Sequence, residues 1–297
     1  MLLLVAEQVE GVWRPVLESS VVTGLGEGVK ATGSLSQRGI ADTLEAVRLA
    51  YAAAQALGCV DINAAATMAA RLALNSGAFL QAAQAQETPV RVLPAQSEAE
   101  LGFLAVAEDP LFASEPILTI IDPGGNSTEL VTASRQGNGW EKSFAQSFPV
   151  GTLGLRDTLL RSESPSSQDL LAASAWIDET LGLEYLPQQS GRAVVLGATG
   201  TNLITIRERM TEWNPARVHG AVLEYEEIGR AVGWLNSMSD TERSAIVGIE
   251  PGREKTIHIG TLILERFLHA IHSPGCTVSV RGWRHALLEC GKTDDWF

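Results

Sequence analysis

The amino-acid sequence predicts an α/β protein with two domains. Strand-like apolar segments alternate along the chain with segments of helical periodicity, which is the pattern of α/β domains. The length of 297 residues is sufficient for two domains of ordinary size. Hydrophobic residues make up 45% of the chain and charged residues 19%. This composition is typical of a folded globular chain and argues against disorder.

The first half of the chain contains a clear helix signal. Apolar residues recur every three or four positions between Ser36 and Leu57, and Gly58 then provides a C-terminal stop. Other segments of this half follow as alternating strands and helices. The expected elements are, in order, a strand at 2–6, a helix at 36–57, a strand at 60–66, a helix at 68–86, a strand at 90–93 and a helix at 96–107.

The second half begins after a segment rich in Asp, Pro, Ser and Glu at 109–116, which marks the expected domain boundary. We therefore expect an N-terminal α/β domain at 1–113 and a C-terminal α/β domain at 114–297. The expected elements of the second domain are two strands on either side of a polar segment at 122–129, a strand at 140–148, a helix at 170–181, a strand at 192–196, three further helical stretches and a strand at 277–280.

Charge and cysteine content exclude several classes of partner. The formal net charge is −13, with 22 Lys plus Arg against 35 Asp plus Glu, so no duplex nucleic acid is expected as a partner. The three cysteines are far apart and show no C-x-x-C spacing, which disfavours a disulfide scaffold or a structural zinc site and fits a reducing cytoplasm. No apolar stretch reaches 18 residues, so no membrane span is expected.

The segment I-D-P-G-G-N-S-T-E-L at 121–130 has two interpretations. The first is a plain β-hairpin turn between two buried strands. The second is a loop that binds an anion through consecutive backbone N–H groups and holds a metal ion. In that interpretation Asp122 is suited to hold Mg²⁺ at the end of a buried strand, and Glu129 is suited to orient a water molecule.

Two further segments could take part in the same chemistry. Residues 194–202 read as a strand, a Gly-rich turn and a helix, which could bind phosphate or could be a tight strand–helix connection. Neither Gly-rich segment has the Gly-Lys-Ser/Thr ending of a P-loop. Glu98 and Glu100 open the helix expected at 96–107, where the pair could cap the helix or supply a general base for a water molecule.

The order of these segments carries more information than any one of them. Upstream lie T-G-L-G-E-G-V at 23–29 and A-T-M-A-A-R at 66–71, followed by the S-E-A helix start at 97–99. After the 122–130 segment come P-V-G at 149–151, G-A-T-G-T at 197–201, Arg253 with Gly260, and G-W-R-H at 282–285. In this order the chain, from about Leu2 to Leu288, resembles the exopolyphosphatase/guanosine pentaphosphate phosphatase family.

This resemblance implies a fold, an activity and a set of residues. The fold would be a two-domain, actin-like and sugar-kinase-like (ribonuclease H-like) α/β fold with an interdomain cleft. The activity would be Mg²⁺-dependent removal of the terminal phosphate from polyphosphate or, second in preference, guanosine pentaphosphate, by a chain that could form a homodimer. The resemblance assigns the general base to Glu98, the carboxylates for metal and water to Asp122 and Glu129, an arginine near the cleft to Arg71, one phosphate loop to Gly124, Gly125, Asn126 and Ser127, and a second to Gly197, Ala198, Thr199, Gly200 and Thr201.

The chain departs from the family pattern at three places, one of which is the segment before Glu98, where L-P-A-Q-S at 93–97 replaces the Ser-Gly pair and further acid that the family usually has. The family's first strand and its D-x-G-S/T-N-S/T phosphate loop have no counterpart, so Leu2–Ala6 is expected to be the second strand of a hairpin whose first strand is missing. Asn126 stands where the family loop has its third glycine, and Pro123 removes one backbone donor. We therefore expect weak or no hydrolysis from the chain starting at Met1. A module that binds polyphosphate or an alarmone without hydrolysing it is the alternative.

Overall fold

The structure is a computed structural model that describes residues 1–137, 139–182, 191–291 and 293–297. The chain divides into two compact units. Met1–Glu98 and Arg284–Phe297 form the first unit, and Ala99–Trp283 form the second. The expected boundary between residues 113 and 114 differs from this division, which falls inside a helix, α5 (Ala95–Ala107).

Two sets of contacts explain the observed division. Phe103, Val106 and Ala107 of α5 pack in one apolar cluster with residues of the second unit's sheet, such as Leu118 and Val194. At the other end of the chain, the residues after Trp283 return to the first unit. There His285 Nε2 lies 3.2 Å from Glu18 Oε1, and Arg91 Nη1 donates to Asp294 Oδ1 at 2.7 Å.

The first unit contains two small sheets. β1 (Leu2–Val9) and β2 (Val12–Ser20) form an antiparallel pair whose turn residues, Glu10 and Gly11, both have positive φ. β2 was not among the expected elements. β3 (Ala65–Ala66) pairs in parallel with β4 (Arg91–Val92), so only the last two residues of the strand expected at 60–66 form a ladder.

The helices of the first unit follow the sequence signals with one interruption. α2 (Gln37–Ala56) begins after Ser36, whose side chain accepts a hydrogen bond from the Gly39 N–H. The single helix expected at 68–86 is instead two helices, because the Asn75 side chain bonds both the N–H and the carbonyl of Leu35 and fixes a non-helical connection. The remaining helices of this unit are α1 (Val29–Thr32), α3 (Met68–Leu72), α4 (Ser76–Ala85), α13 (Trp283–Cys290) and the 3₁₀ helix η3 (Thr293–Trp296).

The second unit is built around a mixed sheet. Its described strands lie in the order β7-β6-β5-β8-β10-β9. β5, β6 and β7 form an antiparallel meander, whereas β5, β8 and β10 run parallel to one another. The strands are β5 (Ile117–Pro123), β6 (Thr128–Gln136), β7 (Gly139–Phe148), β8 (Arg192–Val195), β9 (Val222–Glu224) and β10 (Gly275–Val278).

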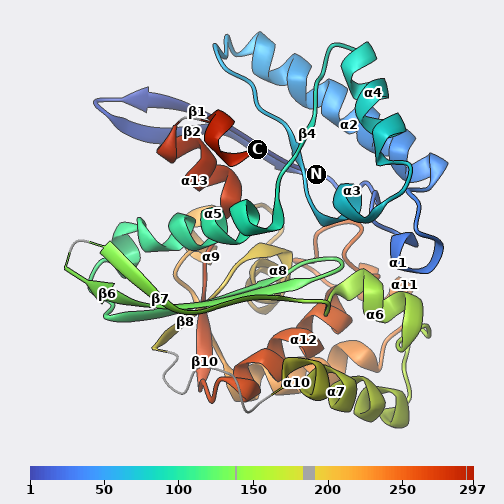
Figure 1. Ribbon diagram of the computed structural model, residues 1–297. Coiled ribbons are helices and arrows are strands. Elements are labelled where there is room, and N and C mark those ends of the chain that lie inside the picture. The colour runs from blue at the N-terminus through green and yellow to red at the C-terminus, as the bar shows by residue number, and fades with distance from the viewer. Residues whose placement is uncertain (138, 183–190, 292) are drawn as a thin grey trace. The chain divides into compact units, whose positions relative to one another are not determined.

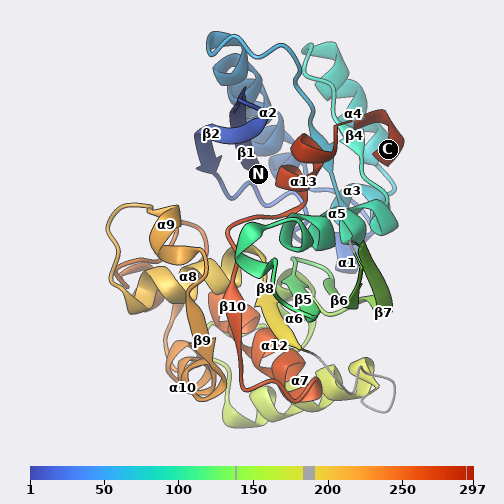
Figure 2. The same cartoon turned by 90° about the vertical axis from the view of Figure 1, so that its left-hand side faces the viewer.

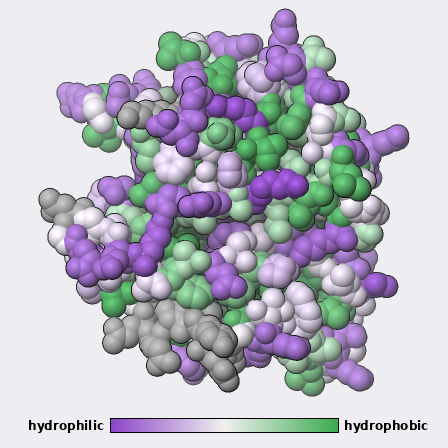
Figure 3. Space-filling view, viewed as in Figure 1, coloured by the Kyte–Doolittle hydropathy of each residue, from purple (hydrophilic) through white to green (hydrophobic). Residues whose placement is uncertain are grey.

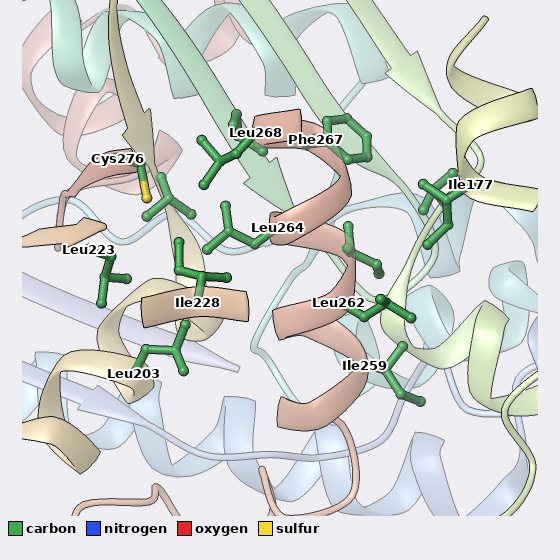
Figure 4. Packing of buried hydrophobic residues seen from close by; sticks show 14 of the residues in the cluster. Ile177, Leu203, Leu223, Ile228, Ile259, Leu262, Leu264, Phe267, Leu268 and Cys276 are labelled. Atoms are coloured by element: carbon green, nitrogen blue, oxygen red, sulfur yellow. The ribbon is translucent and has the colours of Figure 1, made fainter. Parts of the chain in front are cut away.

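Helices cover both faces of this sheet (Figures 1 and 2). α5 packs on one face through the cluster around Phe103. α7 (Ser167–Leu181), α10 (Tyr225–Asn236) and α12 (Ile257–Ala270) lie on the other face. Figure 4 shows α12 at the centre of this second layer, with Leu264 and Phe267 among its buried side chains. The remaining helices are η1 (Pro110–Phe112), α6 (Thr152–Thr158), α8 (Gly197–Arg207), α9 (Pro215–Val218) and α11 (Asp240–Ser244).

In the described parts of the chain, no helix is both long and apolar enough to cross a lipid bilayer. On the face shown in Figure 3, hydrophilic and hydrophobic residues are interspersed.

Candidate functional site

Two carboxylates face each other where β5 turns into β6. Asp122 lies at the end of β5, and Glu129 lies at the start of β6. The two residues are direct partners in the antiparallel ladder. Residues directly opposite in such a ladder point to the same face of the sheet, with Cβ atoms roughly 4.5–5.5 Å apart. The hairpin therefore places the two carboxylates side by side.

Two serine hydroxyls hold Glu129 in place. Its side chain is largely buried, and only 8% of its surface is exposed. Glu129 Oε1 accepts hydrogen bonds from Ser127 Oγ at 2.9 Å and from Ser147 Oγ at 2.7 Å. Ser147 is the partner of Glu129 in the β6–β7 ladder. Sequence reasoning did not identify Ser147, because no motif marks it and only the register of β7 brings it to the site.

The turn between the two strands retains unused donors. The Gly124 N–H donates to the Ser127 carbonyl at 2.8 Å, which closes the hairpin. The next three N–H groups, of Gly125, Asn126 and Ser127, have no acceptor among the described residues. The turn is thus a hairpin, as the plain interpretation expects, and it also presents the consecutive donors that anion binding requires.

The start of α6 orients these donors. The N–H groups of Thr152 and Leu153 donate to the carbonyls of Gly124 and Gly125 at 3.1 and 2.7 Å. In a trans peptide the N–H points away from the carbonyl of the same unit. The N–H groups of Gly125 and Asn126 therefore point away from α6. The sequence resemblance included Gly151 but assigned it no role; a Cβ there would lie 2.4–2.5 Å from backbone atoms of Asn126.

The start of α8 lies beside Asp122. β5 and β8 are parallel neighbours, and the Leu196 N–H donates to the Ile121 carbonyl at 2.9 Å. Gly197 has a φ of +76°, and a Cβ on it would lie 3.2 Å from Asp122 Oδ1. The first N–H groups of a helix have no intrahelical acceptor, so this helix start is a second place for an anion.

Three residues of the segment 197–201 also have packing or local roles. A Cβ on Gly200 would lie 2.6 Å from Val195 Cγ1, so glycine is needed for α8 to pack on β8. Thr199 packs against Gly260 of α12, where a Cβ would lie 2.4 Å from Thr199 Oγ1. Thr201 Oγ1 donates to carbonyls within its own helix. Gly197 and Ala198 are left as the more accessible part of this segment.

Arg71 and Glu98 form an ion pair within the first unit. Arg71 Nη2 donates to Glu98 Oε2 at 2.8 Å, and Nη1 donates to the Leu93 carbonyl at 2.5 Å. Arg71 comes from α3, and Glu98 lies in the first turn of α5. The guanidinium thus fixes the Glu98 carboxylate against the end of β4.

The predicted site residues therefore form two groups. Asp122, Glu129, the turn 124–127 and the start of α8 come together in the second unit. Arg71 and Glu98 come together in the first unit.

The residues around the hairpin fit a Mg²⁺ ion better than a transition metal. In the described parts of the chain, no cluster of three or more His, Cys, Asp or Glu side chains is placed to hold a metal. Mg²⁺ needs only one or two carboxylates, because water and substrate phosphates complete its shell. Asp122 and Glu129 supply two. The buried Asn126 Oδ1 close by has no hydrogen-bond partner among the described residues, so an oxygen donor is also unused there.

Comparison with known proteins gives consistent matches over most of the chain. The sequence model of a family described as the Ppx/GppA phosphatase family matches residues 4–289. Exopolyphosphatase 2 of Mycobacterium tuberculosis is 27% identical over 254 residues, which are 82% of this chain and 77% of the relative. Exopolyphosphatase 1 of Mycobacterium leprae is 25% identical over 282 residues, 91% of this chain and 78% of the relative.

Solved structures give the same picture. The crystal structure of the Aquifex aeolicus Ppx/GppA family member matches with a TM-score of 0.77 at 27% identity, over 98% of this chain and 93% of that one. An exopolyphosphatase from Cytophaga hutchinsonii shares the fold with a TM-score of 0.85 at 21% identity, over 97% and 92% of the two chains. These matches confirm the predicted fold class.

Proposed function

Because this chain belongs to the Ppx/GppA phosphatase family, we propose that it is a Mg²⁺-dependent hydrolase that releases orthophosphate from the end of inorganic polyphosphate. The observation that carries the proposal is the β5–β6 hairpin. It combines two adjacent carboxylates, Asp122 and Glu129, with three consecutive N–H groups that have no acceptor among the described residues.

Hydrolysis of a phosphoanhydride requires positioning and neutralisation of charge more than covalent chemistry. The oxygen of water forms a bond to the terminal phosphorus, and the bond from that phosphorus to the bridging oxygen breaks. The electron pair stays on the bridging oxygen of the shortened chain, and the proton of the water passes to a base. The N–H groups of Gly125, Asn126 and Ser127 are suited to stabilise charge on the transferred phosphoryl oxygens.

The carboxylates have separate roles in this proposal. Asp122 is the ligand for Mg²⁺, which when bound neutralises phosphate charge. Glu129, held by Ser127 and Ser147, orients the cation's water or the attacking water. The family resemblance assigns the general base to Glu98, whose carboxylate is fixed by Arg71.

Polyphosphate is the proposed substrate because the two mycobacterial relatives compared above are named exopolyphosphatases. The N–H groups of the turn are suited to bind phosphate groups, which both candidate substrates carry. Guanosine pentaphosphate is therefore the second candidate substrate.

The test is phosphate release from polyphosphate and from guanosine pentaphosphate, measured with Mg²⁺ and with EDTA. We expect Mg²⁺-dependent release that is faster with polyphosphate. The Asp122→Ala and Glu129→Ala variants should both lose it. Binding of polyphosphate by the wild-type chain without any release of phosphate would instead establish a binding module.

A further inference from the structure

The carboxamide of Asn126 lies unpaired inside the hairpin turn. Only 5% of the residue's surface is exposed, and Oδ1 is shielded from solvent without a hydrogen-bond partner among the described residues. No hydrogen bond of Nδ2 is found there either. A buried polar group without a partner destabilises a protein by ~1–3 kcal/mol, so it calls for an explanation.

The neighbouring hydroxyl groups and the first N–H groups of α6 are committed elsewhere. The Ser127 hydroxyl donates to Glu129, and the Thr128 hydroxyl donates to the Val150 carbonyl at 2.7 Å. The first N–H groups of α6 donate to the carbonyls of Gly124 and Gly125. These groups are therefore occupied and do not donate to Asn126 Oδ1.

A partner for Asn126 Oδ1 must be a hydrogen-bond donor or a cation. An amide oxygen is an acceptor only, and so are the oxygens of an ionised phosphate. Oδ1 therefore cannot pair directly with the substrate's phosphate groups. A divalent cation, or water bound to it, is the partner that suits this oxygen, since amide oxygens are established ligands of hard cations.

We propose that Asn126 Oδ1 is a further protein ligand of the divalent cation, beside Asp122, bound directly or through one water. This inference rests on the proposed function and adds a metal ligand at a position where the family loop has a glycine. Since no described residue donates a hydrogen bond to Oδ1, this oxygen can bind a cation without losing one. The backbone of Asn126 is meanwhile fixed by its close approach to Gly151.

The test measures cation binding without substrate. Mn²⁺ replaces Mg²⁺, because both prefer octahedral oxygen ligands, and its free concentration is followed by electron paramagnetic resonance. Asn126→Gly restores the glycine of the family loop, and Asn126→Asp keeps an oxygen ligand of the same shape while removing the amide donor. Asn214→Gly, in an exposed segment of the second unit, is the matched control. Circular dichroism and thermal unfolding establish that each variant is folded.

We expect Asn126→Gly to weaken Mn²⁺ binding roughly tenfold, in the range found when groups supporting a metal site are removed. Asn126→Asp should bind Mn²⁺ at least as tightly as the wild type, and Asn214→Gly should match the wild type. Binding by Asn126→Gly within twofold of the wild type overturns the inference, whatever the Asp variant does.

One comparison separates this inference from the proposed function. If Asp122→Asn abolishes Mn²⁺ binding while Asn126→Gly leaves it unchanged, the metal-dependent function stands and the role of Asn126 is wrong. If the wild-type chain binds no Mn²⁺, both fail. If Asn126→Gly does not fold, the Asp variant decides alone, and a loss of Mn²⁺ binding by Asn126→Asp overturns the inference.

Discussion

Ser147 donates a 2.7 Å hydrogen bond to Glu129 from the neighbouring strand, at the point where the two residues are partners in the β6–β7 ladder. Together with Ser127, it fixes the one carboxylate oxygen that accepts both bonds. The orientation of Glu129 is thus determined by sheet register, and the turn adds the second bond. Changes on β7 should therefore affect a carboxylate that belongs to β6.

We expect Ser147→Ala to lower kcat for phosphate release at least tenfold, because a hydrogen bond to a charged group contributes roughly 1.5–3 kcal/mol. The matched control is Ser143→Ala on the same strand, since Ser143 Oγ donates to the Thr132 carbonyl and not to Glu129. Steady-state kinetics on polyphosphate measures both variants. Equal kcat for Ser147→Ala and the control would show that Ser147 does not orient Glu129 for catalysis.

Glu98→Gln should abolish hydrolysis while leaving the fold and polyphosphate binding largely intact, because glutamine keeps the shape of glutamate and lacks its basicity. A general base contributes typically ~10²–10⁴-fold to the rate. Glu100→Gln is the control, because Glu100 lies on the same helix and pairs with Lys142. Phosphate release by Glu98→Gln at the wild-type rate would rule out the general-base role.

Asp122→Ala should lose Mg²⁺ dependence as well as rate. Asp122 is the carboxylate next to the start of α8, where Gly197 approaches its Oδ1. Activity is measured over a Mg²⁺ titration, with thermal unfolding as a check on folding. If the variant kept activity and the wild-type Mg²⁺ requirement, the assignment of Asp122 to the metal would be wrong.

The sequence predicted most elements that have a strong local signal. The apolar periodicity from Ser36 to Leu57 and the stop at Gly58 predicted α2 within one residue at each end. The helix α5, which begins at Ala95, was predicted to begin one residue later, at Gln96. Non-local contacts account for the differences. The long helix expected at 68–86 is broken because Asn75 bonds Leu35, which is 40 residues away in sequence.

The sequence motifs predicted which segments form the candidate site. They did not predict the side-chain contacts within it. The pairing of Asp122 with Glu129 follows from a hairpin that the glycines already indicate. The contacts of Ser147 with Glu129 and of Arg71 with Glu98 depend on tertiary packing, which no local pattern encodes. The sequence also could not predict that Asn126 Oδ1 lacks a hydrogen-bond partner among the described residues. That property depends on where the donors of α6 and of Ser127 point.

Gly197→Ala should impair both stability and activity. The residue has a φ of +76°, which costs a non-glycine residue about 1–2 kcal/mol, and the new Cβ would lie 3.2 Å from Asp122 Oδ1. Gly229→Ala in α10 is the control, because no atom lies within 4 Å of its Cβ position and alanine is favoured over glycine in a helix by about 1 kcal/mol. Urea unfolding and phosphate release should show opposite stability changes for the two variants. A Gly197→Ala variant as stable and active as the wild type would show that the start of α8 tolerates a side chain beside Asp122.

His258 makes stability depend on pH. It lies in the first turn of α12 with 1% of its surface exposed, and its Nδ1 has no hydrogen-bond partner among the described residues. Burial, with the nearby charges of Arg243 and Arg156, lowers the pKa of His258 from 6.5 to about 3. In the unfolded chain the imidazole takes up a proton as pH falls through about 6.5, whereas in the folded chain it stays neutral until about pH 3. Between these values the unfolded state binds more protons, so stability decreases as pH falls.

We therefore expect His258 to remove about 2 kcal/mol of the free energy of unfolding between pH 7 and pH 5, since one pKa unit corresponds to about 1.4 kcal/mol. His258→Leu removes the titrating group and keeps a buried side chain of similar size. Urea unfolding of both proteins at pH 7 and pH 5 measures the effect, because the other titrating groups contribute equally to each and cancel in the difference. Between pH 7 and pH 5, the free energy of unfolding of the variant should fall by about 2 kcal/mol less than that of the wild type. If the free energy of unfolding fell equally in the two proteins, His258 would take up its proton as readily in the folded chain as in the unfolded chain. Its burial would then not keep it neutral.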